Sequence, residues 1–435
     1  MKKLLFQWNK IKATFWFIPV ITILVAVLLS IVLVKIDGFV DISQDSFGRF
    51  FLVNSTDSAR SILTTISGAM IGVAGTVFSV TLVALTLASS QFGPRLIKNF
   101  MYVRLNQVVL GSYVSTYLYC LLVLNALKDS EGYMFIPSIS ILAAIVGAIF
   151  NIVLLIVFIH QIATSIQADN VISDISDVIY EKIDALFPEE MGEEKEDKSI
   201  VSVDIEMAKF SKQIAILSPK NGYLQYIDNE VLMEEVVAND ALLDLYHRPG
   251  GFLVKGMEIG KLAINRELEQ SELEKLQKQF VIGKTKTSQQ DLEFSIHQMV
   301  EIAARALSPG VNDPFTAITC IDNLTAALTG LAKLKFPSKY RYDDEGKLRI
   351  IANTVDFEGA LDAAFNQIRQ FSGGSPSVII RLMEALITIH GFTTNAKDRG
   401  AVIEHAEMVL RMGEETIFEK NDLKDLRERS KKILN

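Results

Sequence analysis

The sequence predicts an α-helical integral membrane protein with four transmembrane helices, followed by a cytoplasmic α+β region that combines a small β-module with a helical bundle. The 435 residues are 49% hydrophobic, with a mean hydropathy of +0.28. Residues 1–168 contain 11 Lys or Arg and 6 Asp or Glu, whereas residues 169–435 contain 32 and 45. The chain therefore has two physically different parts, which excludes a single globular domain, a disordered chain and a disulfide scaffold.

Four apolar, charge-free runs in the first part are long enough to cross a bilayer, which needs about 20 residues. We place the spans near 15–34, 62–88, 107–127 and 137–160. The first run is too long for a secretory signal and lacks a small-residue cleavage site, so we interpret it as a retained anchor. It also lacks a polar face and is expected to lie outermost and to meet lipid.

Basic residues predict the orientation of the spans, because they concentrate in cytoplasmic loops. Seven of them precede the first span or follow the second, and four flank the other connections. The seven are Lys2, Lys3, Lys10, Lys12, Arg95, Lys98 and Arg104. Both termini are therefore expected in the cytoplasm of a multi-pass protein.

Composition and periodicity predict four regions. Residues 1–168 form the four-span domain and residues 169–199 a helical extension with an acidic linker. Residues 200–265 contain short strands separated by turns and form a β-rich module. Residues 266–435 follow a helical period and form a cytoplasmic α-helical domain.

The β-rich module resembles the barrel-sandwich fold of biotinyl and lipoyl carrier domains. The resemblance rests on Gly222-Tyr-Leu and on Arg248-Pro-Gly-Gly-Phe-Leu-Val254. A hairpin with a modifiable lysine of the carrier type is missing, since Lys220 lacks the flanking residues. We therefore interpret the module as structural rather than as a carrier.

The second span carries a strip of small and hydroxylated residues along one side. At 100° per residue, the members of this strip fall within about 40° of one line along the helix. They are Ser61, Thr64, Gly68, Gly72, Gly75, Ser79, Thr86 and Ser90. Two interpretations remain open: close dry contact with another helix, which small residues permit, or the water-exposed wall of a pore.

The end of the second span allows two interpretations as well. Gly93-Pro94 stops the helix, and Gln91, Arg95 and Lys98 lie around this stop. They are either interfacial anchors or, repeated around an oligomer, a ring at the inner mouth of a pore.

A polar loop between two predicted helices is the second candidate site. Its members are Arg305, Ser308, Asn312, Asp313 and Thr316. Asp313 is expected to cap the following helix, with Pro314 at its first position, and Arg305 is expected to pair with Asp313. The loop is interpreted as a helix corner; the alternative is a site for a small ligand or a subunit contact.

Nothing in the sequence indicates catalysis. No nucleophile stands beside a base, the histidines show no metal-ligand spacing, and no phosphate-binding loop follows a strand. We therefore predict no catalytic residue, metal or cofactor, and a protein that is not an enzyme. The acidic second part argues against nucleic-acid binding. The absence of charged residues within the spans argues against an ion-coupled transporter.

Two motifs resemble a known family. They are Arg305-Ala-Leu-Ser-Pro-Gly-Val-Asn-Asp-Pro-Phe-Thr-Ala317 and Leu85-Thr-Leu-Ala-Ser-Ser-Gln-Phe-Gly-Pro-Arg95. Both resemble the hallmarks of a bacterial family of predicted membrane proteins, domain of unknown function 2254, and the resemblance covers most of the chain. It implies four spans, a cytoplasmic domain and a bacterial plasma membrane, but no activity and no catalytic residues.

The leading functional hypothesis is a homo-oligomeric pore or channel-like assembly with a cytoplasmic regulatory domain. The alternative is a membrane-anchored scaffold or sensor that binds a cytoplasmic partner or ligand. The expected partners are the lipid bilayer and further copies of the chain. The sequence does not specify an ion or small ligand.

Overall fold

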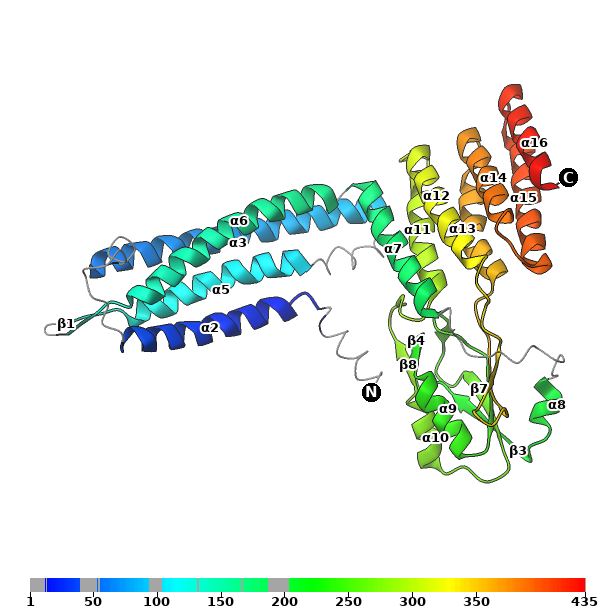
Figure 1. Cartoon of the computed structure of the whole chain (residues 1–435), viewed down its shortest axis with the longest axis horizontal. Coiled ribbons are helices and arrows are strands. Elements are labelled where there is room, and N and C mark those ends of the chain that lie inside the picture. Colours follow the sequence, from blue (N-terminus) through cyan, green and yellow to red (C-terminus); the bar gives the residue numbers. More distant parts are fainter. Residues whose placement is uncertain are drawn as a thin grey trace. The chain divides into compact units, whose positions relative to one another are not determined.

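The computed structural model describes residues 14–39, 55–93, 104–130, 133–165, 167–186 and 203–434, together with residues 12 and 53. The chain divides into two compact units, Met1–Asn170 and Val171–Asn435 (Figure 1). Arg95 and Lys98, two of the predicted inner-mouth residues, lie outside the described residues.

The described part of the first unit contains four helices that are long and apolar enough to cross a membrane. They are α2 (Phe17–Asp37), α3 (Thr56–Phe92), α5 (Arg104–Ala126) and α6 (Ser138–Ser165). A hairpin of β1 (Lys128–Ser130) and β2 (Tyr133–Phe135) joins α5 to α6. The four predicted apolar helices are confirmed. The second is longer than its apolar run, because Asp57, Arg60 and Gln91 continue the helix at its ends.

Helix α5 forms the centre of this unit and packs against α2, α3 and α6 (Figure 1). Helix α2 lies close against Gly111 of α5. A Cβ atom added to Gly111 would lie 2.6 Å from Oγ1 of Thr22 and 3.0 Å from Cα of Pro19. Only Ala26 and Ser30 of α2 are buried within the described chain. The opposite side of α2 is therefore open to its surroundings.

Hydrogen bonds between side chain and backbone fix α5 against α6. The hydroxyl of Tyr113 donates to the carbonyl of Asn151 at 2.7 Å, and that of Tyr119 donates to the carbonyl of Ser140 at 2.9 Å. The amide of Asn151 donates in turn to Oγ1 of Thr116 at 2.8 Å. Bonds of this kind set the register of two apolar helices, because an unpaired polar group in an apolar surrounding is costly.

Asp37, the last residue of α2, caps the beginning of α6. Its Oδ1 accepts from the backbone N–H of Ile139 at 2.8 Å. Its Oδ2 accepts from the N–H of Ser140 at 3.0 Å and from the hydroxyl of Ser140 at 2.6 Å. These N–H groups have no partner within their own helix, and a carboxylate is favourable at a helix N-terminus. The contact therefore joins the first long helix to the last.

The second unit begins within α7 (Ala168–Leu186) and continues, after residue 202, with a β-rich part. Its strands within residues 203–434 are β3 (Lys212–Leu217), β4 (Gly222–Ile227), β5 (Leu242–Leu245), β6 (Phe252–Leu253), β7 (Glu258–Ile264), β8 (Phe280–Gly283), β9 (Tyr340–Tyr342) and β10 (Leu348–Ala352). Three short helices accompany them: α8 (Val203–Met207), α9 (Asn229–Ala238) and α10 (Gln270–Gln277).

These strands form two sheets with a shared apolar core. One sheet has the order β3-β7-β5-β10-β9, and the other has the order β6-β4-β8. Leu224 and Ile282 of the smaller sheet pack with Leu243 and Leu262 of the larger sheet in one buried cluster. The turn after Leu217 therefore connects strands of two different sheets, and β3 and β4 do not pair with each other.

Three strands come from the region in which only helices were expected. Strand β8 pairs with β4, and β9 and β10 extend the larger sheet, with β10 parallel to β5. Buried Arg349 of β10 supports this addition. Its Nε lies 2.7 Å from Oδ2 of Asp343, and its Nη1 lies 2.8 Å from Oδ1 of Asp240. Strand β10 was missed because β5, with which it pairs, lies about a hundred residues earlier in the chain.

The rest of the second unit is a stack of three helical pairs. The helices are α11 (Leu292–Ala306), α12 (Pro314–Leu331), α13 (Phe357–Phe371), α14 (Pro376–His390), α15 (Ala396–Thr416) and α16 (Lys420–Leu434). Within these described residues, α11, α13 and α15 form one row, and α12, α14 and α16 form the other. All six helices lie in the region for which a helical period was predicted.

We expect Asp37→Ala to destabilise the first unit by about 1–2 kcal/mol, as the loss of a helix cap does. Asp37→Asn should cost less, because its amide oxygen can still accept a hydrogen bond. The measurement is the thermal unfolding of the full chain in detergent. The matched control is Asp57→Ala, whose side chain is 94% exposed. An equal loss in the two alanine variants would contradict the cap.

Candidate functional site

Helix α3 has two different faces. The face that packs against the rest of the unit carries its buried residues. They are Thr56, Ala59, Leu63, Ser67, Met70, Ala74, Val77, Thr81, Ala84, Ala88 and Phe92. The eight residues of the predicted strip, Ser61 to Ser90, are all exposed. At 100° per residue, the strip lies on the opposite side of the helix from the buried face.

Among the described residues, nothing packs closely against the glycines of the strip. A Cβ atom added to Gly68, Gly72 or Gly75 would meet nothing within 4 Å. Glycine weakens a helix by roughly 1 kcal/mol relative to alanine, so three glycines without a close neighbour need another explanation. Intrachain helix packing therefore does not account for the strip.

Most hydroxyl groups of the strip bond to their own helix. Thr64 donates to the carbonyl of Arg60 at 2.7 Å, Ser79 to that of Gly75 at 2.9 Å, and Thr86 to that of Leu82 at 2.9 Å. These bonds satisfy each donor without water. The strip can consequently face either an apolar neighbour or a lumen, to which each oxygen still offers a lone pair.

The predicted inner mouth is described in part. Helix α3 ends at Phe92, and Gly93 has a φ of 108°, a conformation that favours glycine. Gln91 is exposed in the last turn. The stop at Gly93 agrees with the predicted end of the helix, whereas the roles of Arg95 and Lys98 stay predictions.

The predicted polar loop is a compact corner between α11 and α12. The hydroxyl of Ser308 donates to the carbonyl of Arg305 at 2.6 Å, and the N–H of Asp313 donates to the carbonyl of Ala306 at 2.8 Å. Asn312 has a φ of 52°, which asparagine tolerates better than most residues. The loop thus reverses the chain and satisfies the backbone groups at two helix ends.

Asp313 caps α12, as predicted from its position before Pro314. Its carboxylate accepts from the N–H of Thr316 at 3.2 Å and from the hydroxyl of Thr316 at 2.6 Å. These bonds, led by the hydroxyl, lower the pKa of Asp313 below its usual range. Thr316 is thus a hydrogen-bond partner of this carboxylate, and the expected pairing of Arg305 with Asp313 stays a prediction.

Two large apolar side chains are exposed on this corner. Val311 is 52% exposed and Phe315 is 77% exposed. A contiguous exposed apolar patch marks an interaction surface, whereas single exposed apolar residues are common on protein surfaces. The alternative of a subunit contact at this loop therefore remains a prediction.

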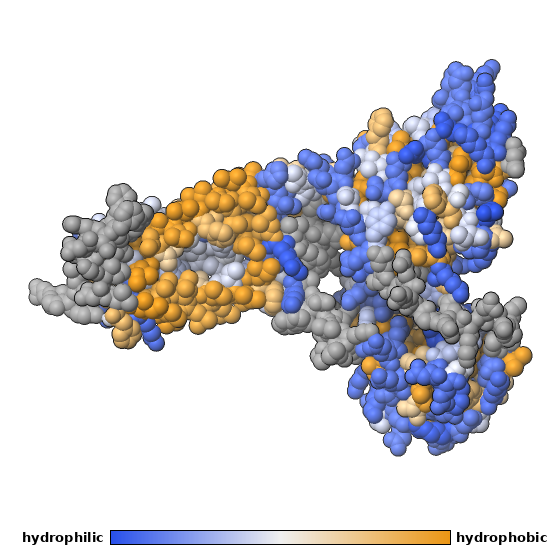
Figure 2. Space-filling model, viewed as in Figure 1, coloured by the Kyte–Doolittle hydropathy of each residue, from blue (hydrophilic) through white to orange (hydrophobic). Residues whose placement is uncertain are grey.

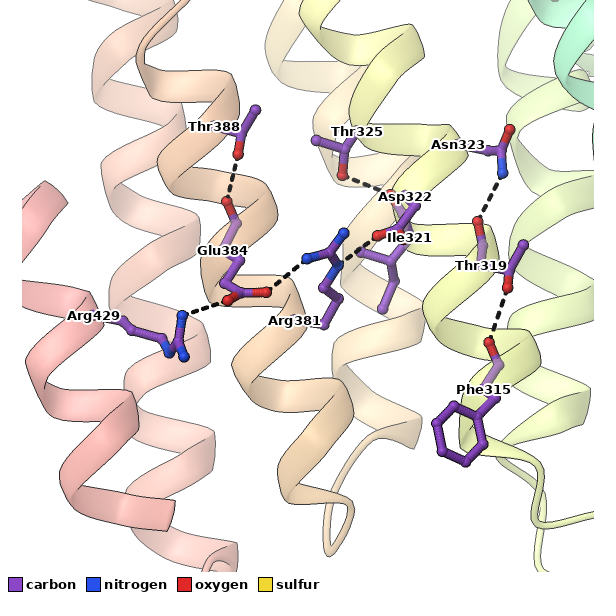
Figure 3. A network of polar contacts seen from close by, with 10 residues as sticks. All are labelled: Phe315, Thr319, Ile321, Asp322, Asn323, Thr325, Arg381, Glu384, Thr388 and Arg429. Carbon is purple, nitrogen blue, oxygen red and sulfur yellow. Dashed lines mark hydrogen bonds and ion pairs between the residues drawn. The ribbon is translucent and has the colours of Figure 1, made fainter. Parts of the chain in front are cut away.

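A chain of charged residues crosses the row of α12, α14 and α16 (Figure 3). Asp322 bonds to Arg381 at 2.5 Å, and Arg381 bonds to Glu384 at 2.8 Å. Glu384 also pairs with Arg429 of α16. Bonds to Asp322 and Glu384 raise the pKa of Arg381. Sequence reasoning missed this network, because its members lie on three helices and show no common spacing.

Helices α12 and α14 run in the same direction. In Figure 3, Phe315, Thr319 and Asn323 ascend along α12 as Arg381, Glu384 and Thr388 ascend along α14. The turns that precede these two helices therefore lie at the same end of the stack. The corner with Phe315 is one of these turns.

The other titratable residues that the structure describes do not form a metal site. In the part of the chain that the structure describes, no group of three or more His, Cys, Asp or Glu could hold a metal ion. His405 lies 3.1 Å from Asp362, and burial lowers the pKa of His405. Cys120 and Cys320 are both buried and not disulfide-bonded, and burial raises the pKa of Cys320.

Comparisons with known proteins agree with the two motifs. The family described as Predicted membrane protein (DUF2254) matches residues 12–388. Uncharacterized proteins of Mycobacterium tuberculosis and Mycobacterium bovis are 30% identical over 373 residues, which cover 84% of this chain and 70% of each relative. No solved structure matches the chain.

The cap of α12 leads to a pH-dependent prediction. Because the folded state lowers the pKa of Asp313, this carboxylate stabilises the protein fully above its unfolded pKa near 4 and loses that effect as the pH falls through the folded pKa. We expect Asp313→Ala to cost about 1 kcal/mol at pH 7 and less near pH 3. Thermal unfolding of both proteins at several pH values measures this difference. A difference that stays constant with pH would contradict the role of the carboxylate.

Proposed function

This chain belongs to the DUF2254 family of predicted membrane proteins, and from this membership and the two faces of α3 we propose that it is a multi-pass membrane protein whose α3 helices meet in a homo-oligomer and line a passive pore. The proposed membrane is the bacterial plasma membrane, with both termini in the cytoplasm. The exposed strip on α3 is the observation that carries this proposal.

The surface of the first unit supports insertion into a bilayer. Large apolar side chains are exposed along α2, α3 and α6, among them Leu28, Val83 and Ile156. Hydrophobic residues cover the visible face of these helices, whereas the second unit is mostly hydrophilic (Figure 2). Exposure of so large an apolar surface to water would be strongly unfavourable, whereas lipid would cover it.

The strip supports contact between copies. Lipid alone gives no reason to align Gly68, Gly72 and Gly75, because leucine would serve as well there. Contact with another helix gives such a reason, since glycine lets two backbones approach closely. The same strip on a second copy is a suitable partner, because a closed oligomer repeats one surface around its axis.

A central lumen follows when several copies place this strip around one axis. The strip contains no charged group, so that water could fill the lumen without a titratable gate in the membrane. Gln91, Arg95 and Lys98 would then form the proposed inner mouth. The proposal includes no catalytic step and no cofactor.

A scaffold or sensor is the second candidate function. The stack from α11 to α16 favours it, because stacked helical pairs commonly present an extended surface to partners. The exposed Phe315 lies on this stack. A scaffold needs the contact between copies along α3 but no water within it, so that the two functions differ in a measurable way.

The first test concerns Gly72, whose position faces open space in the single chain. Gly72→Leu should weaken the oligomer by roughly 1–3 kcal/mol through overpacking, which shifts the chain toward monomer in mild detergent. The measurement is the mass of the protein by light scattering. Ala69→Leu is the control, because Ala69 is equally exposed but lies off the strip. Equal behaviour of the two variants would remove the strip from the interface.

The second test separates a pore from a scaffold. Purified protein in liposomes should pass small ions passively, and Ser79→Leu should strongly reduce this flux, because an apolar side chain can close a narrow lumen by dewetting. Val80→Leu is the control, since exposed Val80 points about 100° away from Ser79. A folded oligomer that passes neither cations nor anions would refute the pore and favour the scaffold.

A further inference from the structure

Two turns of the β-rich part are held together at one end of its sheets. The backbone N–H of Ser218 donates to the carbonyl of Met257 at 2.8 Å, and the N–H of Gly256 donates to the carbonyl of Ser218 at 2.9 Å. The N–H of Lys255 donates to Oδ1 of Asn221 at 2.7 Å. Residues 218–221 and 254–257 therefore form one compact surface, which we name the β-tip.

A third segment reaches the same end. Gly222 opens β4 at the β-tip, and the pairing of Tyr223 with Gly283 places the end of β8 beside it. Lys284 and Lys286 follow directly. The ammonium group of Lys286 lies 5.8 Å from the ring centroid of Tyr223. Residues 283–286 thus complete the β-tip.

Exposed apolar side chains surround this surface. Phe252 is 53% exposed and Val254 is 52% exposed, and Leu217 and Met257 are exposed beside them. Phe252 stands against Tyr223 with ring centroids 5.0 Å apart. These residues come from β3, β4, β6 and the two turns, and they leave the core of the sheets to face outward.

The β-tip is basic within an acidic part of the chain. Lys220, Lys255, Lys284 and Lys286 lie in its three segments. Residues 217–226, 249–257 and 281–288 contain no Asp or Glu, although residues 169–435 as a whole contain 45 of them against 32 Lys or Arg. Glu258, directly after Met257, is the acidic residue nearest to the β-tip along that segment.

From this juxtaposition of four lysines with exposed Phe252, Val254 and Met257, we propose that the β-tip docks on an anionic lipid surface. Apolar side chains enter the headgroup region while lysines pair with lipid phosphates, which is the usual composition of a peripheral membrane contact. The lysines favour an anionic partner, and the exposed apolar side chains beside them favour a lipid surface. This docking needs one copy of the chain in a bilayer and does not depend on contact between α3 helices.

The test uses the full chain in nanodiscs, with an environment-sensitive dye on Val254→Cys. Native Cys120 and Cys320 are buried and should not react. In phosphatidylglycerol discs, a spin-labelled lipid should quench this dye, and quenching should fall in phosphatidylcholine discs. A dye on Thr388→Cys, which is exposed on the helical stack, should remain in water in both lipids.

The lysines provide the matched variants. Replacing Lys220, Lys255, Lys284 and Lys286 with Gln should lower the ratio of docked to free β-tip roughly fivefold for each lysine replaced. Replacing the same four with Arg should preserve docking, which excludes a general loss of folding. Quenching that is equal in the two lipids and unchanged in the Gln variants would overturn the proposal. Protection of the dye without quenching by the lipid would also overturn it and would assign the β-tip to an acidic protein or a nucleic acid.

Discussion

Inside an apolar helix bundle a polar side chain has no water to bond, and this constraint determines how the four long helices of the first unit fit together. Tyr113 and Tyr119 of α5 reach backbone carbonyls of α6, and Asn151 of α6 reaches Thr116. Each bond fixes the register of α5 against α6. Because α5 also packs against α2 and α3, these bonds connect the central helix of the unit to its last one.

The same constraint applies to the two sides of α3. On one side of this helix, Leu63, Met70 and Val77 pack against the rest of the unit. On the other side, glycines and hydroxyls that bond to their own helix face outward. A helix that served only as a membrane anchor would need just the first side. The outward side is therefore the part of α3 that the single chain leaves unexplained, and it carries the proposed assembly.

Much of this organisation could be predicted from the sequence, where the signal was local. Charge-free runs identified the four long helices, a helical period identified α11 to α16, and Asp313-Pro314 identified a cap. The contribution of β10 to the larger sheet could not be predicted, because its pairing with β5 joins distant segments. The same applies to the network of Asp322, Arg381 and Arg429 on three helices. Periodicity also located the strip on α3. That the strip faces outward could be seen only from the structure, in which the opposite side of α3 packs against α5 and α6.

The cap that Asp37 provides for α6 has a consequence for the biogenesis of the protein. Synthesis proceeds from the N-terminus, so that α2 leaves the ribosome first and its partner N–H groups at Ile139 and Ser140 follow about a hundred residues later. Until α6 arrives, the carboxylate has no partner in this helix, and afterwards it closes the bundle at one end. The bonds of Asp37 are therefore present only in the completed four-helix unit.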